Sequence, residues 1–326
     1  MIKGTNTKLV NAVAAYFTEL RQVRASGGAT GERSRYGPLA NLLNAIGAML
    51  KPKVFCVGEL ADQGAGHPDF GFYAAKQIKK GQPRYGQMPE RGVVEVKAAD
   101  DDAWLTAEGD QVSGYWNHYR LVLVTNTRDF ILVGEDGSGL PVKLETFQLA
   151  DGVDDFNRKL DKPLAFAREV GTGFGEYLAR ALSHQATLAE PRDLAWLLAS
   201  YARDGLERVE AADDTPSLKT IRSALEEALG VQFEGERGMR FFHSTLVQTL
   251  FYGVFSAWVL WSKNLKANEG PLFEGSYRPA QFDWRATVWN LRAPVLRTLF
   301  QQISDPGRLQ PLGLVEILDW TAATLN

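Results

Sequence analysis

The sequence has little of several residue types, and each shortage narrows what the protein can be. Only one of its 326 residues is a cysteine, Cys56, so no intramolecular disulfide can form, which fits a reducing compartment such as the cytoplasm. The four histidines are too scattered to show metal-ligand spacing. The formal net charge is -3, so the chain as a whole is not a basic nucleic-acid binder. Any contact with phosphate groups must come from local clusters of basic residues.

Long apolar runs are also scarce, which argues against a membrane protein. The N-terminal residues 1–6 lack the apolar core of a signal peptide. Residues 241–261 are long enough to cross a bilayer, but polar residues between His243 and Ser256 interrupt them. We therefore interpret this segment as a core helix of an α-helical domain, and we predict a cytoplasmic protein without a membrane partner.

The first half of the chain mixes helical and strand patterns. Periodicity predicts helices at 6–25, 38–50 and about 108–119. Short apolar or alternating runs predict strands at 54–58, 69–73, 92–98, 120–125 and 130–134. This order is typical of α/β or α+β layers, and we predict the α/β class, with helices flanking a mixed sheet.

The second half changes character, because almost every stretch has helical period and no strand pattern is convincing. The predicted helices are 160–170, 172–186, 191–209, 216–229, 239–265, 284–302 and 312–325. We interpret the glycines between 171 and 175 as a break between two helices. The predicted domains are therefore an α/β domain at 1–155 and an all-α domain at 156–326. The chain stops directly after a helical pattern, which suggests a piece of a longer protein.

Three charged residues lie on two of the predicted strands. Asp69 follows Pro68, and Glu95 and Lys97 flank Val96 in an otherwise apolar run. Side chains alternate along a strand, so Glu95 and Lys97 point to the same face, and pairing of the two strands would bring Asp69 to them. An isolated Glu-x-Lys is common on an exposed sheet edge, but charge within an apolar strand is costly unless it is used.

Paired carboxylates point to a divalent cation, because two negative charges at short range repel each other unless a cation lies between them. Oxygen ligands suit Mg²⁺, and a lysine beside the metal can orient water and stabilise charge on a phosphate. The chemistry this arrangement serves is metal-assisted hydrolysis of a phosphodiester.

With these motifs, residues 32–135 resemble the PD-(D/E)XK nuclease superfamily, whose restriction-endonuclease-like fold is a mixed sheet flanked by helices. Gln111-Val-Ser-Gly-Tyr115 is similar to the Gln-x-x-x-Tyr motif of one branch. The segment from Glu32 to Leu39 resembles the Glu-bearing segment of single-chain restriction-modification enzymes (types IIG and ISP), although Tyr36 falls one place later here.

The second half extends this resemblance to the helical spacer of the same enzymes. Thr249-Leu-Phe-Tyr-Gly-Val-Phe-Ser256 and Arg292-Ala-Pro-Val-Leu-Arg-Thr-Leu-Phe300 are similar to segments found there. In that family a methyltransferase and target-recognition domains follow in the same polypeptide. No Asn/Asp-Pro-Pro-Tyr motif is present, so methyltransferase chemistry is not expected in this chain.

The resemblance implies a role for each site residue. Asp69, Glu95 and the main-chain carbonyl of Val96 would bind Mg²⁺, and Lys97 would position or activate water. Gln111 and Tyr115 would support the site or contact DNA, and Glu32 would be a further acidic group near the metal. The substrate would be double-stranded DNA, cut to leave 5′-phosphate and 3′-hydroxyl ends.

The connection between the two acidic strands is basic and could track phosphates, although an ordinary solvated loop explains the charges equally well. Its cations are Lys76, Lys79, Lys80, Arg84 and Arg91. Two alternatives to a restriction-modification nuclease stay open. One is a standalone phage-defence nuclease with a partner-binding helical domain, and the other is a catalytically inactive nuclease fold that binds DNA or assembles with a partner.

Overall fold

The chain separates into two compact units in the computed structural model, which describes residues 2–26, 32–62, 64–135, 139–184, 186–188, 190–212, 215–267 and 281–325. The first unit is Met1–Asp193 and the second is Leu194–Asn326. The division falls later than the boundary predicted after residue 155. The reason is that α5 (Val153–Leu160) and α6 (Pro163–Ser183) pack against α1 (Ile2–Ala25) in the first unit.

The first unit contains a six-stranded mixed sheet, so the predicted α/β class is confirmed. Its strands are β1 (Val54–Gly58), β2 (Phe70–Ala74), β5 (Val93–Val96), β6 (Val122–Thr125), β7 (Asp129–Glu135) and β8 (Pro141–Gln148). Their spatial order is β1-β2-β5-β6-β7-β8. β5 and β6 are parallel, and the other neighbours are antiparallel. A separate two-stranded ribbon pairs β3 (Ile78–Lys79) with β4 (Gln82–Pro83).

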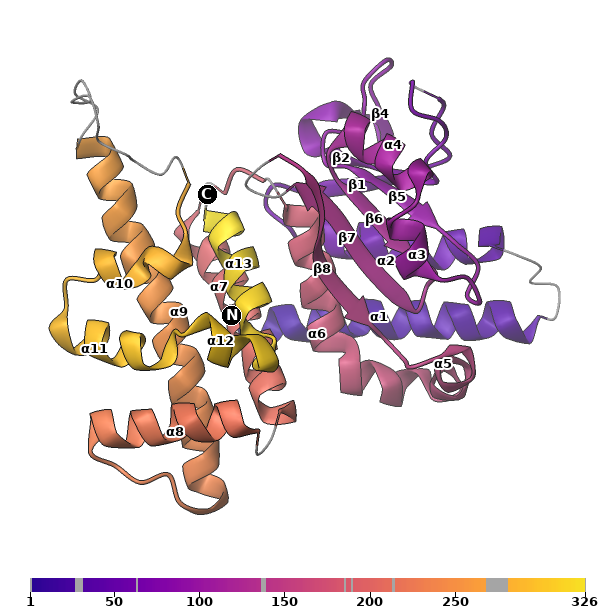
Figure 1. Cartoon of the computed structure of the whole chain (residues 1–326). Helices are drawn as coiled ribbons and strands as arrows, with labels where there is room; N and C mark the ends of the chain where they lie inside the picture. The colour runs from indigo at the N-terminus through magenta and orange to yellow at the C-terminus, as the bar shows by residue number, and fades with distance from the viewer. Residues whose placement is uncertain are drawn as a thin grey trace. The chain divides into compact units, whose positions relative to one another are not determined.

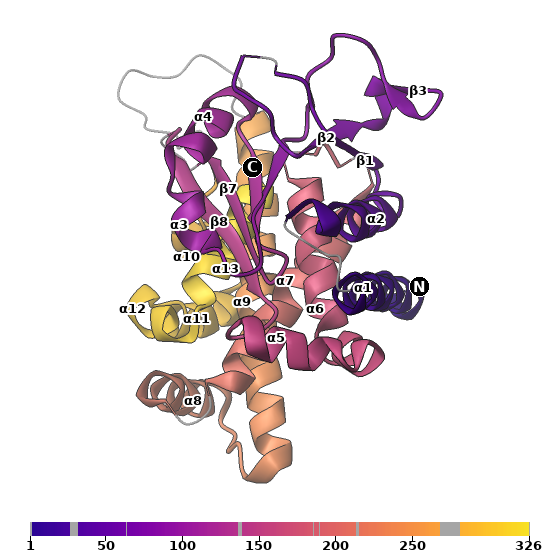
Figure 2. The same ribbon diagram turned by 90° about the vertical axis from the view of Figure 1, so that its right-hand side faces the viewer.

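Helices cover both faces of this sheet (Figures 1 and 2). On one face lie α3 (Ala103–Ala107) and α4 (Asp110–Tyr119), which share a core cluster with residues of β5, β6 and β7. On the other face lie α1, α6 and α2 (Tyr36–Gly47), which pack on one another and, through α2, on β1. A short 3-10 turn, η1 (Glu32–Arg35), leads into α2.

The central strand β5 is buried along its whole length because β2 and β6 flank it and helices cover both its faces. Gly92 allows the chain to enter β5 close to the start of β6. Its φ of +96° is unfavourable for other residues, and a Cβ there would lie 2.6 Å from the carbonyl oxygen of Leu121. The chain therefore enters β5 in close contact with the start of β6.

The glycines near 171–175 do not break a helix, contrary to the sequence prediction, because α6 runs through them without interruption. Gly171 faces Val10 and Gly175 faces Leu9. A Cβ added at these glycines would lie 3.3 Å and 2.8 Å, respectively, from the nearest atom of α1. The missing side chains let α1 and α6 approach closely. Close helix packing thus explains a glycine pattern that sequence alone attributes to a break.

Strand β8 and helix α3 were not predicted from the sequence. β8 was missed because it begins at Pro141 and carries charges. One of these charges, Glu145, is buried and forms an ion pair with Arg180 of α6 (2.9 Å). Helix α3 is short, and Asp102 caps its N-terminus. Asp102 accepts hydrogen bonds from the backbone N–H groups of Trp104 and Leu105 (2.8 and 3.1 Å).

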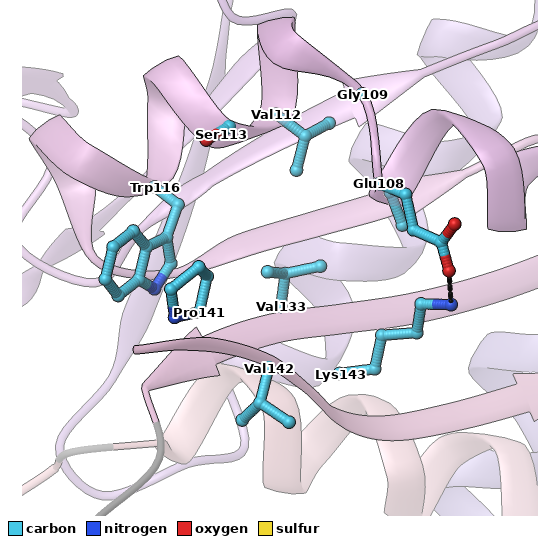
Figure 3. A pocket seen from close by; sticks show the side chains of 10 residues that line it. Glu108, Gly109, Val112, Ser113, Trp116, Val133, Pro141, Val142 and Lys143 are labelled. Atoms are coloured by element: carbon cyan, nitrogen blue, oxygen red, sulfur yellow. Dashed lines mark hydrogen bonds and ion pairs between the residues drawn. The ribbon is translucent and has the colours of Figure 1, made fainter. Parts of the chain in front are cut away.

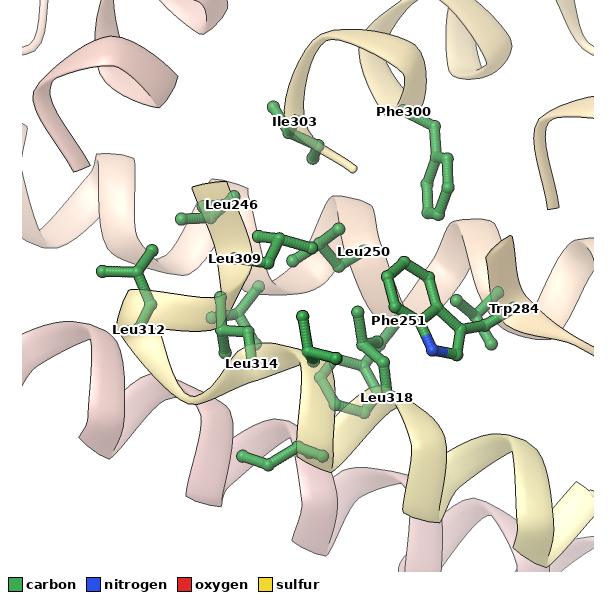
Figure 4. Packing of buried hydrophobic residues seen from close by; sticks show 14 of the residues in the cluster. Leu246, Leu250, Phe251, Trp284, Phe300, Ile303, Leu309, Leu312, Leu314 and Leu318 are labelled. Carbon is green, nitrogen blue, oxygen red and sulfur yellow. The ribbon is translucent and has the colours of Figure 1, made fainter. Parts of the chain in front are cut away.

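The second unit is helical in every part that the structure describes. Its elements are α7 (Pro191–Ala211, which begins just before the division), α8 (Pro216–Leu229), α9 (Gly235–Ala267), η3 (Trp284–Ala286), α10 (Thr287–Asn290), α11 (Pro294–Ile303), α12 (Pro306–Leu309), η4 (Gln310–Leu312) and α13 (Leu314–Leu325). The helix predicted at 284–302 is divided, because Pro294 starts a new helix after an extended Leu291. Figure 4 shows Trp284 and Phe300 in the apolar core of this unit, beside leucines of α9 and α13.

The apolar segment 241–261 lies within α9. One side of the helix joins the core through residues such as Leu246 and Leu250, while Phe241 and Tyr252 are exposed. The predicted core helix is therefore confirmed with an exposed side. Among the described residues, no helix combines the length and the apolar character that a membrane span requires.

Candidate functional site

The three predicted charged residues come together where β2 begins and β5 ends. β2 and β5 pair antiparallel, with Phe70 opposite Val94, and the backbone N–H of Asp69 donates to the carbonyl of Val94 (3.1 Å). The Asp69 carboxylate then reaches across to β5, where Oδ2 accepts a hydrogen bond from the Val96 N–H (2.7 Å). The predicted pairing of these strands is confirmed, and it fixes Asp69 beside the end of β5.

Glu95 and Lys97 lie on the same face of β5, as strand alternation predicts. The Lys97 ammonium donates to Glu95 Oε1 at 2.6 Å. The Glu95 side chain is only 4% exposed, whereas that of Lys97 is 26% exposed. A carboxylate this deeply buried is strongly destabilising unless a positive charge compensates it, and Lys97 supplies that charge.

Helix α4 covers the face onto which Glu95 and Lys97 project. Lys97 Nζ lies 3.4 Å from Gln111 Oε1, and Gln111 Nε2 donates to the Tyr115 hydroxyl (3.0 Å). Glu95, Lys97, Gln111 and Tyr115 thus form one chain of polar contacts. Burial raises the pKa of the Tyr115 phenol, and the negative charges of Glu95 and Asp69 raise it further. Tyr115 therefore remains a neutral hydrogen-bonding group at neutral pH.

Tyr36 is a member of the site that the sequence did not identify. Its hydroxyl donates a short hydrogen bond to Asp69 Oδ1, and its ring packs on Phe70 with 5.2 Å between ring centroids. Tyr36 is the first residue of α2 and follows the Glu-bearing segment, which was the available signal. The backbone of Glu32 starts η1, but its side chain lies outside the described residues, so its predicted role stays a prediction.

The basic connection between β2 and β5 divides into exposed and buried cations. Lys76, Lys79, Lys80 and Arg84 are exposed, and two of them lie on or beside the β3–β4 turn, where Lys80 has a φ of +53°. Tyr85 is fully exposed next to Arg84. Arg91 differs, because it is buried and donates to the carbonyl of His184 (3.4 Å). Arg91 is therefore a structural residue of the first unit and not a surface contact for phosphate.

The donor set at the site suits Mg²⁺ better than a metal that needs a complete protein cage. Among the residues described, no cluster of three or more His, Cys, Asp or Glu side chains is arranged to hold a metal. The site offers two carboxylates, Asp69 and Glu95, beside the backbone of Val96. Mg²⁺ commonly binds through one or two carboxylates and completes its octahedron with water and substrate phosphate.

A separate hollow of about 470 Å³ lies on the same unit between α4 and the β7–β8 hairpin (Figure 3). Trp116, Val133 and Pro141 line it, and the ion pair between Glu108 and Lys143 (2.6 Å) lies at one side. None of Asp69, Glu95 and Lys97 lines this hollow. The hollow and the charged site are therefore different places on the first unit.

Comparison with known proteins adds little to this geometry. No protein-family model and no curated protein match the chain. Among solved structures, the chain is similar to one in a cryoEM structure of a DrdV–DNA complex, with a TM-score of 0.33 and 13% sequence identity over 95% of this chain. This chain spans only 26% of the length of that one. A likeness of this size does not establish a common fold, so the function has to be inferred from the residues of the site.

Proposed function

We propose that the first unit is a magnesium-dependent DNA endonuclease core of the PD-(D/E)XK type. The observation that carries the proposal is the meeting of Asp69, Glu95 and Lys97 at the adjoining ends of β2 and β5, with Lys97 held at 2.6 Å from Glu95. Buried charge of this kind is costly in a structural core, so it points to a chemical use.

Each side chain has a defined part in this proposal. Asp69, Glu95 and the Val96 carbonyl would hold Mg²⁺, which when bound supplies positive charge to the phosphate and lowers the pKa of a water molecule. Lys97 lies beside Glu95, where its ammonium would orient the attacking water and stabilise negative charge on the phosphate. Gln111 would hold Lys97 in place, and Tyr36 and Tyr115 would fix the neighbouring groups by hydrogen bonds.

Contacts with DNA outside the reacting phosphate would come from the β3–β4 ribbon. Lys79 and Lys80 are exposed there, with Lys76 and Arg84 on either side, and exposed cations of this kind release counterions when they meet phosphates. Such contacts give affinity without sequence preference.

The second unit would serve as a coupling segment in the same proposal. Its apolar helical core contains no aspartate, glutamate, lysine or arginine among the described buried residues, so the chemistry is assigned to the first unit alone. The resemblance of both halves to single-chain restriction-modification enzymes favours a cytoplasmic protein that works with methyltransferase and target-recognition domains.

The first test is cleavage of supercoiled plasmid in the presence of Mg²⁺. We expect nicking by the full chain, and a loss of at least about 10²-fold in rate with Asp69→Ala and with Lys97→Ala, which is the order of magnitude for removing one group that acts in the transition state. Glu108→Ala and Lys143→Ala are matched controls, because they remove the two charges of an exposed ion pair elsewhere in the unit.

The outcome also separates the alternatives. Nicking that survives both site substitutions would contradict the assignment of the site. DNA binding without any Mg²⁺-dependent nicking, in the full chain and with its natural flanking domains, would favour the inactive DNA-binding module. Cleavage that needs no methyltransferase partner would favour the standalone defence nuclease.

A further inference from the structure

A second polar hollow, of about 220 Å³, lies in the first unit on the α1 side of the sheet. Apolar side chains of α1 and α5 form one wall, and Arg24, Arg35 and Asn157 bring polar groups to it. Ala99, which follows β5, and Thr127, in the turn after β6, complete the lining. The hollow has room for several molecules the size of water, at about 30 Å³ each.

The two arginines at this hollow are in different electrostatic situations. Arg24 is already neutralised, since it forms a short ion pair with Asp161 and donates to the carbonyl of Asn157 (2.6 Å). Arg35 is only partly exposed and makes no ion pair with any of the side chains that the structure describes. Arginine stays charged in proteins, so Arg35 brings to the hollow a positive charge that none of the described side chains neutralises by an ion pair.

The neighbourhood of Arg35 also contains an unsatisfied hydroxyl. Thr127 is fully buried, and its Oγ1 has no hydrogen-bond partner among the described residues, although its backbone N–H is held by Thr125 Oγ1 (2.8 Å). The Tyr16 hydroxyl donates to the Thr127 carbonyl at 3.4 Å. Burial raises the pKa of the Tyr16 phenol, and the charge of Arg35 opposes that rise in part. Arg35 and Thr127 both line the hollow. A buried hydroxyl without a partner is destabilising unless a ligand supplies the missing acceptor.

Residues that line this hollow are close in sequence to residues that form the candidate nuclease site. Arg35 directly precedes Tyr36, whose hydroxyl binds Asp69. On the sheet, the Lys97 N–H donates to the carbonyl of Thr125 (2.8 Å), and Thr127 follows two residues later. Segments next to those that hold the carboxylates therefore line the hollow, which lies on the α1 side of the sheet, while Glu95 and Lys97 project to the α4 side.

We propose that this hollow binds a phosphate of the DNA strand close to the one that is cut, with Arg35 as the cation and the Thr127 hydroxyl as a hydrogen-bond donor. This inference rests on the proposed nuclease function and identifies a substrate contact that the sequence motifs did not contain. Arginine is well suited to this role, since its planar donors match phosphate oxygens.

A first experiment uses inorganic phosphate as the probe and needs neither DNA nor catalysis. We expect phosphate to raise the melting temperature of the full chain by mass action, and Arg35→Gln to abolish the rise. Arg33→Gln is the matched control, because Arg33 is an exposed arginine on the same 3-10 turn. Without phosphate, Arg35→Gln should melt no lower than the wild type, since it removes a charge that forms no ion pair with the described side chains.

A second experiment tests the DNA contact, with Ca²⁺ in place of Mg²⁺ to prevent cleavage. The affinity for a DNA duplex is measured by fluorescence anisotropy at several salt concentrations. Each phosphate contact contributes about 0.9 to the slope of log K against log[salt], so Arg35→Gln should reduce that slope by about 0.9 relative to Arg33→Gln. Arg35→Lys should retain most of the slope, because it keeps the charge.

The results separate this inference from the proposed function. Normal Mg²⁺-dependent nicking together with identical salt slopes for Arg35→Gln and Arg33→Gln would overturn the phosphate pocket and leave the nuclease standing. A slope that falls only with Arg35→Gln, in a chain that nicks DNA neither alone nor with its natural flanking domains, would support the pocket and contradict the nuclease. Phosphate stabilisation equal in Arg35→Gln and wild type would also overturn the pocket.

Discussion

The two units of this protein bury different kinds of side chain. In the first unit, the buried charged residues of the described ranges are Arg91, Glu95, Asp129, Glu145, Glu176 and Arg180. In the second unit, the buried polar residues of the described ranges are Ser200, His243, Thr287 and Thr321, with no acidic or basic side chain other than the histidine. The comparison teaches that the first unit depends on matched charge and the second on apolar volume. Removing one charge of a buried pair in the first unit should therefore lower the free energy of unfolding more than an apolar exchange that conserves volume in the second unit.

The largest loss of stability is expected when the buried ion pair between α6 and β8 is broken. Arg180→Met keeps the length of the side chain but leaves Glu145, with Glu176 nearby on α6, buried without that cation. We expect a loss of about 3–5 kcal/mol in the free energy of unfolding of the first unit.

The single cysteine makes this measurement specific to the first unit. Cys56 is buried in β1, so the rate at which a thiol reagent labels it in increasing urea reports on unfolding there. Lys143→Met, at the exposed pair with Glu108, is the matched control and should change stability by no more than about 1 kcal/mol. Equal effects of the two substitutions would refute the dependence on buried charge.

Acid should destabilise the first unit through His184. Burial, assisted by the charge of Arg91, lowers the pKa of His184 to about 4 in the folded chain, against about 6.5 when unfolded. The unfolded chain therefore takes up a proton first, so the contribution is complete above pH 6.5 and is lost as the pH falls toward 4. The loss is up to about 3 kcal/mol.

The same labelling of Cys56 at pH 7 and pH 5 tests this pH dependence. His184→Gln cannot be protonated and should make the stability of the first unit less sensitive to acid over this range. His67→Gln is the matched control, since it replaces an exposed histidine of the same unit. Unchanged sensitivity in His184→Gln would assign the effect to other groups.

The smallest effect is expected from an apolar exchange in the second unit. Leu250 is fully buried beside Phe300 and Leu246 in its core, yet Leu250→Met conserves volume and should cost less than about 1.5 kcal/mol. Hydrogen exchange of peptides from α9 and α11 measures the change. A loss as large as that of Arg180→Met would remove the contrast between the units.

Local patterns predicted much of the fold. The strand at 54–58 and the helix at 216–229 have the predicted bounds, and the helix is fixed by the Thr215 cap and by Gly230 in the left-handed region. Strand alternation also placed Glu95 and Lys97 together. Long-range pairings were not accessible: Arg180 makes Glu145 a core residue, and α1 turns the glycines of α6 into packing positions.

The same limit applies to the candidate site. The Asp69, Glu95 and Lys97 set follows from strand order and spacing. Tyr36 and Arg35 come to their places only because η1 and α2 pack beside the sheet, and no short motif encodes that packing. Sequence reasoning thus misses residues that reach the site only through the packing of another element.

The packing of α1 against α6 also determines when the first unit can be completed during synthesis. α1 emerges first, but its partner α6 ends at Ser183, after every strand of the sheet has been made. Contacts between distant parts of a chain form slowly and leave apolar surface exposed in the meantime. Until α6 arrives, the face of α1 that carries Leu9 and Val10 has no cover from it. Completion of the first unit therefore waits until the chain has been made as far as Ser183, well after the residues of the candidate site have emerged.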